Sequence, residues 1–172
     1  EPLIPADAKL KGSKVKKTQE NDSLGYTEWT LKNGIKVIVR PSTLKADEVR
    51  ISAVSKGGKS LLSDADLFTG DLLPMVMSQS GISKFSATEL AKQLTGKNAY
   101  ASVGVADYEH AVNAGGSPKD IETILQLIYL NFTDPRFDQT DLDNLKKMYV
   151  PYFVNMEKDP NYIASKKSIA TV

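Results

Sequence analysis

Residues 26–40, which read YTEWTLKNGIKVIVR, decide the fold class of this chain. Two stretches rich in β-branched and aromatic residues, 26–31 and 35–40, stand on either side of Asn33-Gly34. An Asn-Gly pair between two such stretches is the strongest short-range signal of a β-hairpin, because a type I′ turn needs a positive φ at both central residues. We therefore predict an antiparallel hairpin whose second strand ends at Pro41.

The other strand signals also come in neighbouring runs. Apolar and polar residues alternate over about 48–55, and Gly57-Gly58 ends that run. The ranges 98–106 and 108–114 alternate in the same way and predict a second hairpin, which Gly115-Gly116 closes. Strands joined by short loops favour antiparallel pairing. We therefore predict one five-stranded, mainly antiparallel sheet.

Helical spacing of apolar residues separates and follows these strands. Residues 64–80 predict a helix that Pro74 should kink or split, and residues 139–158 predict a long one that Pro151 should bend. Between them, the capping box at 86–89 opens a short helix that ends at Gly96. A further helix begins at Ser117-Pro118, since Ser is a good N-cap and Pro suits the first helical position.

The helices are amphipathic, so the economical arrangement is an α+β two-layer sandwich in which a mainly antiparallel sheet carries helices on one face. The length of 172 residues suits one domain of ordinary size. We divide the chain into a linker segment with little core of its own, residues 1–23, and a single domain, residues 24–172. No strand follows the last predicted helix, so we expect this domain to be truncated at its C-terminal end.

Composition excludes several kinds of chemistry. Lys and Arg number 22 against 21 Asp and Glu, so no global charge favours nucleic acid or a membrane surface. The chain has no Cys and one His, His110, which leaves a poor ligand set for zinc. A Ser-His-Asp triad would have to use His110, and no G-x-S-x-G motif surrounds any Ser. From composition and motifs alone, the sequence describes a folded domain without visible chemistry.

Five phrases of the sequence carry a family resemblance. They are WTLKNGIKVIV at 29–39, SKGG at 55–58, GISKFS at 81–86, LAKQLTGK at 90–97 and FTDPR at 132–136. In this order they resemble one repeat of the insulinase/pitrilysin-type zinc peptidases, which include the mitochondrial processing peptidases. The third repeats of large exported bacterial peptidases are most similar, and the resemblance covers about residues 24–161.

The resemblance also implies where catalytic zinc would be bound. Family members are built from paired repeats, and in one of them an H-x-x-E-H motif on the first long helix supplies two His ligands and the Glu that activates water, with a more distant Glu as third ligand. Anchoring on Met77 and Gly81 places that motif on residues 72–76, which here read LLPMV. We therefore expect no catalytic or metal-binding residue and no cofactor in this chain, with zinc in another repeat of the parent protein.

The implied function is that of a non-catalytic repeat. It would form a chamber wall that helps enclose and position a peptide substrate, partly by β-addition of the peptide to a sheet edge. Its partners would be the other repeats of the same polypeptide and the peptide, without nucleic acid or membrane insertion, and no substrate-binding residue is assigned. The parent is expected to be a periplasmic or secreted zinc metalloendopeptidase, although no signal peptide leads this chain. This chain alone is predicted to be inactive. The alternative is a non-peptidase scaffold or binding module of the same fold.

Two groups of residues suggest other chemistry. His110 beside Glu109 could serve an unrelated enzyme, but a lone His on a predicted strand favours an ordinary hydrogen-bonded or exposed side chain. Asp138, Asp141 and Asp143 could bind a cation, but no Gly-containing calcium loop surrounds them. Acidic residues in the first turn of a helix are favoured by the helix dipole, and we prefer that interpretation.

Overall fold

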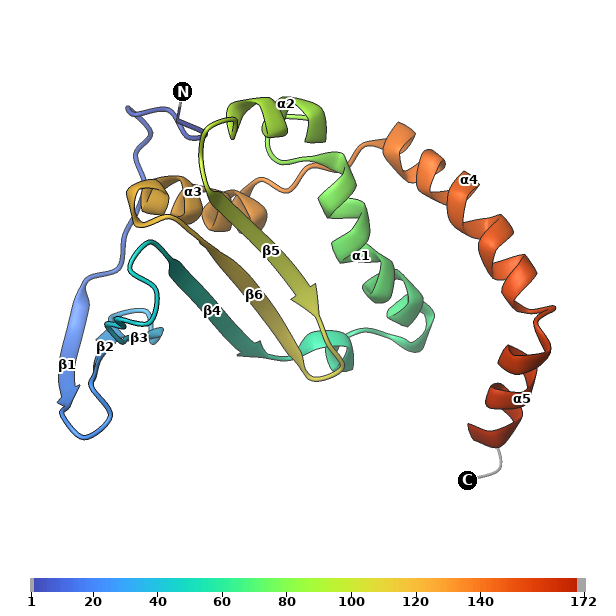
Figure 1. Ribbon diagram of the computed structural model, residues 1–172, viewed down its shortest axis with the longest axis horizontal. Helices are drawn as coiled ribbons and strands as arrows, with labels where there is room; N and C mark the ends of the chain where they lie inside the picture. The colour runs from blue at the N-terminus through green and yellow to red at the C-terminus, as the bar shows by residue number, and fades with distance from the viewer. Residues whose placement is uncertain (1, 170–172) are drawn as a thin grey trace.

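Two antiparallel sheets and five α-helices make up the part of the chain, residues 2–169, that the computed structural model describes (Figure 1). The first sheet has the order β1-β2-β3 and consists of β1 (Val15–Asn21), β2 (Tyr26–Leu31) and β3 (Lys36–Val39). The second has the order β4-β6-β5 and consists of β4 (Val49–Lys56), β5 (Ala99–Val105) and β6 (Glu109–Gly116). The helices are α1 (Leu67–Ser80), α2 (Ala87–Gln93), α3 (Ile121–Thr133), α4 (Gln139–Met156) and α5 (Pro160–Ile169).

The predicted α+β class with antiparallel pairing is confirmed, but the prediction of a single five-stranded sheet is wrong. The hairpin β2–β3 pairs with β1, and β4 pairs with β6 instead of extending the hairpin. Strand β3 has only four residues, and nine residues separate its end from β4. The two sheets are therefore separate units, and Figure 1 shows the β1–β2–β3 sheet set apart from the second sheet.

The first residues of the chain contribute more structure than the sequence predicted. Leu3 and Ile4 are buried, and their backbone N–H groups donate to Oε1 of Gln126 on α3 at 2.8 and 3.3 Å. Strand β1 then pairs along the whole of β2. The sequence VKKTQEN gave little sign of this strand because almost all of its side chains are exposed, so its pairing requires no apolar alternation.

The turn of the first hairpin differs from the predicted type I′ turn. Gly34 has φ +89°, but Asn33 does not have a positive φ. The N–H of Gly34 donates to the carbonyl of Leu31 at 3.0 Å, and the N–H of Leu31 donates to the carbonyl of Ile35 at 2.8 Å. This is the pattern of a three-residue loop, a type I turn followed by a left-handed glycine, which is the next most common hairpin connection.

The second sheet carries helices on one face, as the two-layer prediction requires. Helix α3 packs across β5 and β6, and α1 packs against β5. Ile124 of α3 is fully buried beside Val112 and Ala114 of β6. A second cluster joins α3 to the start of the chain and to the loop after α1; it contains Leu3, Ile4, Ile82, Leu127 and Leu130.

The helix boundaries follow local signals, with one addition. The capping box at α2 is present, since Ser86 and Glu89 each bond to the backbone of the other. Helix α1 continues through Pro74 as one helix, and α4 continues through Pro151. Helix α5 was not predicted. Within residues 2–169, no helix combines the length and apolarity that a bilayer span requires.

Candidate functional site

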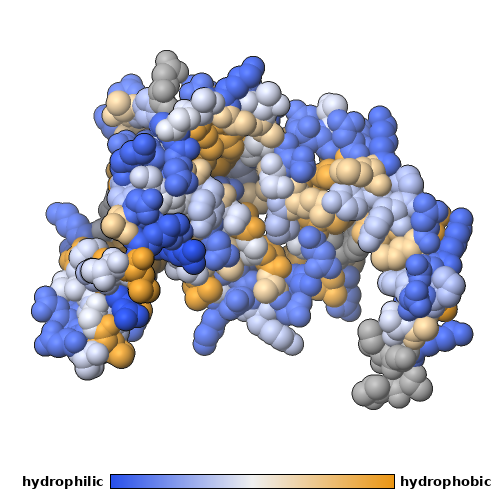
Figure 2. All heavy atoms as spheres, in the orientation of Figure 1, coloured by the Kyte–Doolittle hydropathy of each residue, from blue (hydrophilic) through white to orange (hydrophobic). Residues whose placement is uncertain are grey.

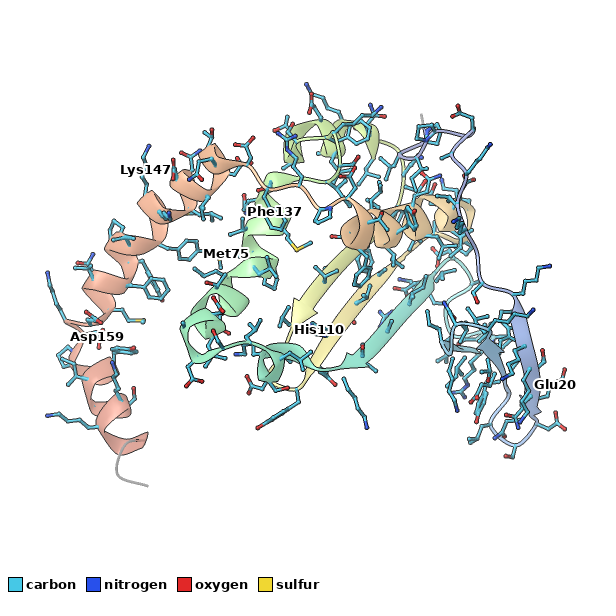
Figure 3. All side chains as sticks on the ribbon, turned by 180° about the vertical axis from the view of Figure 1, so that it is seen from behind. Glu20, Met75, His110, Phe137, Lys147 and Asp159 are labelled. Carbon is cyan, nitrogen blue, oxygen red and sulfur yellow. The ribbon has the colours of Figure 1, made fainter. Side chains whose placement is uncertain are left out.

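An apolar groove of about 300 Å³ lies between α1 and α4. In Figure 3, Met75 lies on the side of α1 that faces α4, whereas Lys147 points away on the outer side of α4. Almost all of the groove surface is carbon and sulfur. The lining residues are Leu72, Met75 and Val76 from α1, and Leu142, Leu145, Lys146, Tyr149, Val150 and Phe153 from α4.

Helical periodicity explains why these side chains meet. Leu72, Met75 and Val76 stand at positions i, i+3 and i+4, so they share one face of α1. The apolar residues of α4 that line the groove recur at three- and four-residue intervals in the same way. Each helix therefore offers an apolar stripe, and the two stripes form opposite walls.

Two contacts near the ends of these helices fix the groove. At the C-terminal end of α1, Ser80 is fully buried and its Oγ accepts a hydrogen bond from the N–H of Asp138 at 3.4 Å. At the other end, Lys59 Nζ lies 2.6 Å from Asp71 of α1 and 2.9 Å from Asp107 in the β5–β6 turn. The hydrogen bonds to Asp71 and then Asp107 raise the pKa of Lys59 above its ordinary value. These contacts anchor α1 to the sheet and the start of α4 to α1.

The groove occupies the place that the family resemblance assigns to catalytic zinc. The resemblance would place the His, Glu and His of H-x-x-E-H on residues 72, 75 and 76, and all three carry apolar side chains that line the groove. The opposite wall contributes no carboxylate to the lining, and its charged residue is the cation Lys146. Zinc requires nitrogen, sulfur or carboxylate ligands, so this donor set does not fit the metal.

No other part of the described chain replaces that site. Among the side chains that the structure describes, no group of three or more His, Cys, Asp and Glu residues is arranged to hold a metal ion. The expectation that zinc is bound in another repeat remains a prediction.

His110 is part of a turn-holding contact. Figure 3 shows it at the start of β6, near the turn that follows β4. Its Nδ1 accepts a hydrogen bond from the N–H of Gly58 at 3.3 Å. Around it, the backbone N–H groups of Gly57, Lys59 and Ser60 donate to carbonyls of the β5–β6 turn. The imidazole therefore has a structural partner.

Two of the three acidic residues at the start of α4 have side-chain contacts of their own, and Asp141 stands in the first turn of the helix. Asp138 caps the helix, since its Oδ1 accepts from the N–H of Thr140 at 2.9 Å, and its Oδ2 lies 3.0 Å from Arg136. The hydrogen bond from the Thr140 backbone is the main cause of a pKa below the ordinary value for Asp138. Asp143 accepts a hydrogen bond from Gln139 at 2.8 Å. Capping and helix-surface contacts thus account for Asp138 and Asp143.

The outer edge of β4 is a second candidate feature. In the order β4-β6-β5, β4 is an edge strand whose outer N–H and C=O groups have no strand partner within residues 2–169. Its side chains are largely exposed, and Val54 points away from the helix-covered face of the sheet. An edge of this kind can add an extended peptide through backbone hydrogen bonds.

Comparisons with known proteins establish the fold. No protein-family model and no curated protein sequence matches this chain. Among solved structures, a mutant of the ferredoxin protease FusC in complex with Arabidopsis ferredoxin matches with a TM-score of 0.79 and 16% sequence identity. The periplasmic protease PqqL from Escherichia coli matches with a TM-score of 0.80 and 18% identity. Each match covers 98% of this chain but only 19% and 18% of the two proteases, so this chain spans about a fifth of their length.

Proposed function

We propose that this chain is a non-catalytic repeat of a longer zinc metallopeptidase of the insulinase/pitrilysin type. Its fold matches part of two proteases over 98% of its length, which supports a peptidase-like domain. The observation that carries the non-catalytic assignment is the apolar lining of the groove, which includes Leu72, Met75 and Val76 at the positions that the resemblance gives to the zinc motif. Hydrolysis then takes place at a zinc ion in another repeat of the same polypeptide.

The repeat contributes to the wall that encloses the peptide substrate. Two features support this role. The edge of β4 offers unpaired backbone groups for β-addition, and such binding needs few special side chains. The face of the second sheet opposite α3 carries small and polar residues along β6, such as Ala111 and Asn113.

We further propose that the parent protein works in the periplasm. PqqL is described as a periplasmic protease, and the sequence phrases resemble those of exported bacterial peptidases. The absence of Cys accords with that location and with others, so the proposal depends on the resemblance.

Bound zinc per chain, measured by elemental mass spectrometry after dialysis against micromolar zinc, tests the assignment. Well under one equivalent and no peptide hydrolysis are expected for the 172-residue chain, whereas the longer polypeptide hydrolyses peptides and loses activity with a chelator. One tightly held equivalent in the 172-residue chain would overturn the proposal. A longer polypeptide without any H-x-x-E-H repeat would favour the non-peptidase scaffold instead. The His110→Ala variant is the control: an unchanged zinc content would show that any residual zinc is bound adventitiously and not by His110.

A further inference from the structure

The apolar surface of α4 is wider than its one neighbour can cover. Leu145 is buried against α1, but Met148, Val150 and Tyr152 are each more than half exposed. At 100° per residue, the arc from Met148 through Leu145 to Val150 spans about 200° of the helix surface. A helix that packs against one layer needs an apolar stripe of only roughly 100°. Helix α4 is therefore suited to two neighbours.

Helix α1 has the same property. One side of it packs against β5, and a different side, with Leu72, Met75 and Val76, forms the groove wall. Two further apolar residues, Leu73 and Met77, lie about 100° or more around the helix from Leu72. A helix that is apolar nearly all round is typical of a buried position. The groove is thus bordered on both sides by helices that are suited to further contacts.

We propose that the α1–α4 groove is the seat of a third helix, contributed by another part of the same longer polypeptide. The inference rests on the proposed function, in which this chain is one repeat of a larger protein. The length of the two similar proteases favours that source over a second copy of this chain, because the matched fold makes up less than a fifth of each.

The lining of the groove also defines the chemistry of its occupant. The walls are apolar along their length, so the incoming helix presents an apolar stripe with a three- and four-residue repeat. Lys146 brings the one positive charge to the lining of the groove. An acidic residue at the edge of the incoming stripe would pair with it.

Single cysteines test the inference cleanly, because the chain has no Cys. Val150→Cys places a thiol in the groove at a position that is 56% exposed and close in size to the original side chain. Asn144→Cys places one on an exposed position of the same helix outside the groove. The rate of maleimide labelling is measured for both variants in the 172-residue chain and in the longer polypeptide, with circular dichroism to confirm folding.

Both thiols are expected to react quickly in the 172-residue chain. In the longer polypeptide, only Val150→Cys is expected to be protected, by roughly tenfold or more, since it then reacts only when the docked helix opens. Equal rates in the two proteins would overturn the inference. Protection that appears in the 172-residue chain as its concentration rises would also overturn it, because a second copy would then fill the groove. Zinc content and peptide hydrolysis are recorded separately, so an active peptidase with an open groove refutes only this inference.

Discussion

The backbone N–H of Gly58 donates a hydrogen bond to Nδ1 of His110 at 3.3 Å, across 52 positions of the sequence. Because Nδ1 accepts this bond, the neutral imidazole carries its proton on Nε2. The bond joins the turn after β4 to the first residues of β6. The only histidine of the chain therefore supports a turn, and its interaction can be tested by stability measurements.

Replacing His110 by Leu should destabilise the fold. Gly58 is buried, so its N–H would lose its acceptor, at a cost of about 1–3 kcal/mol in the free energy of unfolding. Urea unfolding followed by circular dichroism measures the change. Tyr108→Leu, at a neighbouring position whose side chain is 78% exposed, is the matched control and should change stability little. Equal effects of the two substitutions would contradict the structural role.

Gly58→Ala should cost more than Gly25→Ala, although both glycines have φ +64°. A Cβ at Gly25 meets open space, so that variant carries only the left-handed backbone cost of about 1–2 kcal/mol. A Cβ at Gly58 would lie 2.2 Å from the carbonyl oxygen of Ala106 and 2.5 Å from the nitrogen of Glu109. Thermal unfolding of the two variants gives the comparison. Similar midpoints would contradict this expectation and would mean that the β5–β6 turn moves away from the added Cβ without loss of stability.

Ile124→Ala should be among the most damaging single changes. This side chain is fully buried between α3 and the second sheet, and truncating a buried Ile costs about 2–5 kcal/mol. Leu125→Ala, one residue further along α3 and 53% exposed, should cost well under that in the isolated chain. Urea denaturation of both variants separates the effect of burial on stability from that of helix propensity. Both substitutions place Ala at neighbouring positions of α3, so they differ mainly in how buried the original side chain is.

The ion pairs of Lys59 with Asp71 and Asp107 should make the stability of the fold depend on pH in the alkaline range. Its raised pKa means that the stabilisation is complete below the ordinary value of 10.5 and is lost as the pH rises past it. Lys59→Met should therefore lose less stability than the wild type between pH 8 and 11.5. The urea midpoint is measured at several pH values, with Lys119→Met as the control. A parallel decline in Lys59→Met and wild type would refute the effect.

Glu89 should make the stability of the fold depend on pH in the acidic range. Hydrogen bonds from the backbone and hydroxyl of Ser86 lower its pKa, so its stabilisation is present above the ordinary value of 4.5 and is lost as the pH falls further. Glu89→Gln should be less stable than wild type at pH 7, and the difference should shrink towards pH 2. Thermal midpoints across this range test it, and a difference that stays constant with pH would argue against the ionised cap.

The features that the sequence predicted are those that depend on neighbouring residues. The hairpin around Asn33-Gly34, the capping box at Ser86 and the amphipathic helix α3 are all formed, because turn residues, caps and periodicity act over a few positions. The same local rules missed β1, whose side chains are almost all exposed and so carry no periodic signal.

The division into two sheets and the groove depend on contacts between distant residues. Nothing in the sequence near Val49 shows that β4 pairs with β6, where Val49 lies opposite Gly116, and not with the preceding hairpin. The groove likewise needs the meeting of α1 and α4, although the apolar residues at 72–76 were already recognised as unsuited to zinc. That α4 lies opposite these residues follows only from the packing of the two helices.

The two sheets also differ in how they can form during synthesis. Strands β1, β2 and β3 are consecutive, so each pairing closes a short loop and the first sheet can assemble as soon as its last residue leaves the ribosome. Strand β4 must wait for β6, since Val49 pairs with Gly116, and its exposed edge has no partner for that interval. The first sheet carries exposed apolar residues from the start, among them Ile38 and Val39. Figure 2 shows hydrophobic surface on this part of the molecule. In the nascent chain, the first sheet therefore forms early while β4 stays unpaired, which exposes β4 to aggregation until β6 has been synthesised.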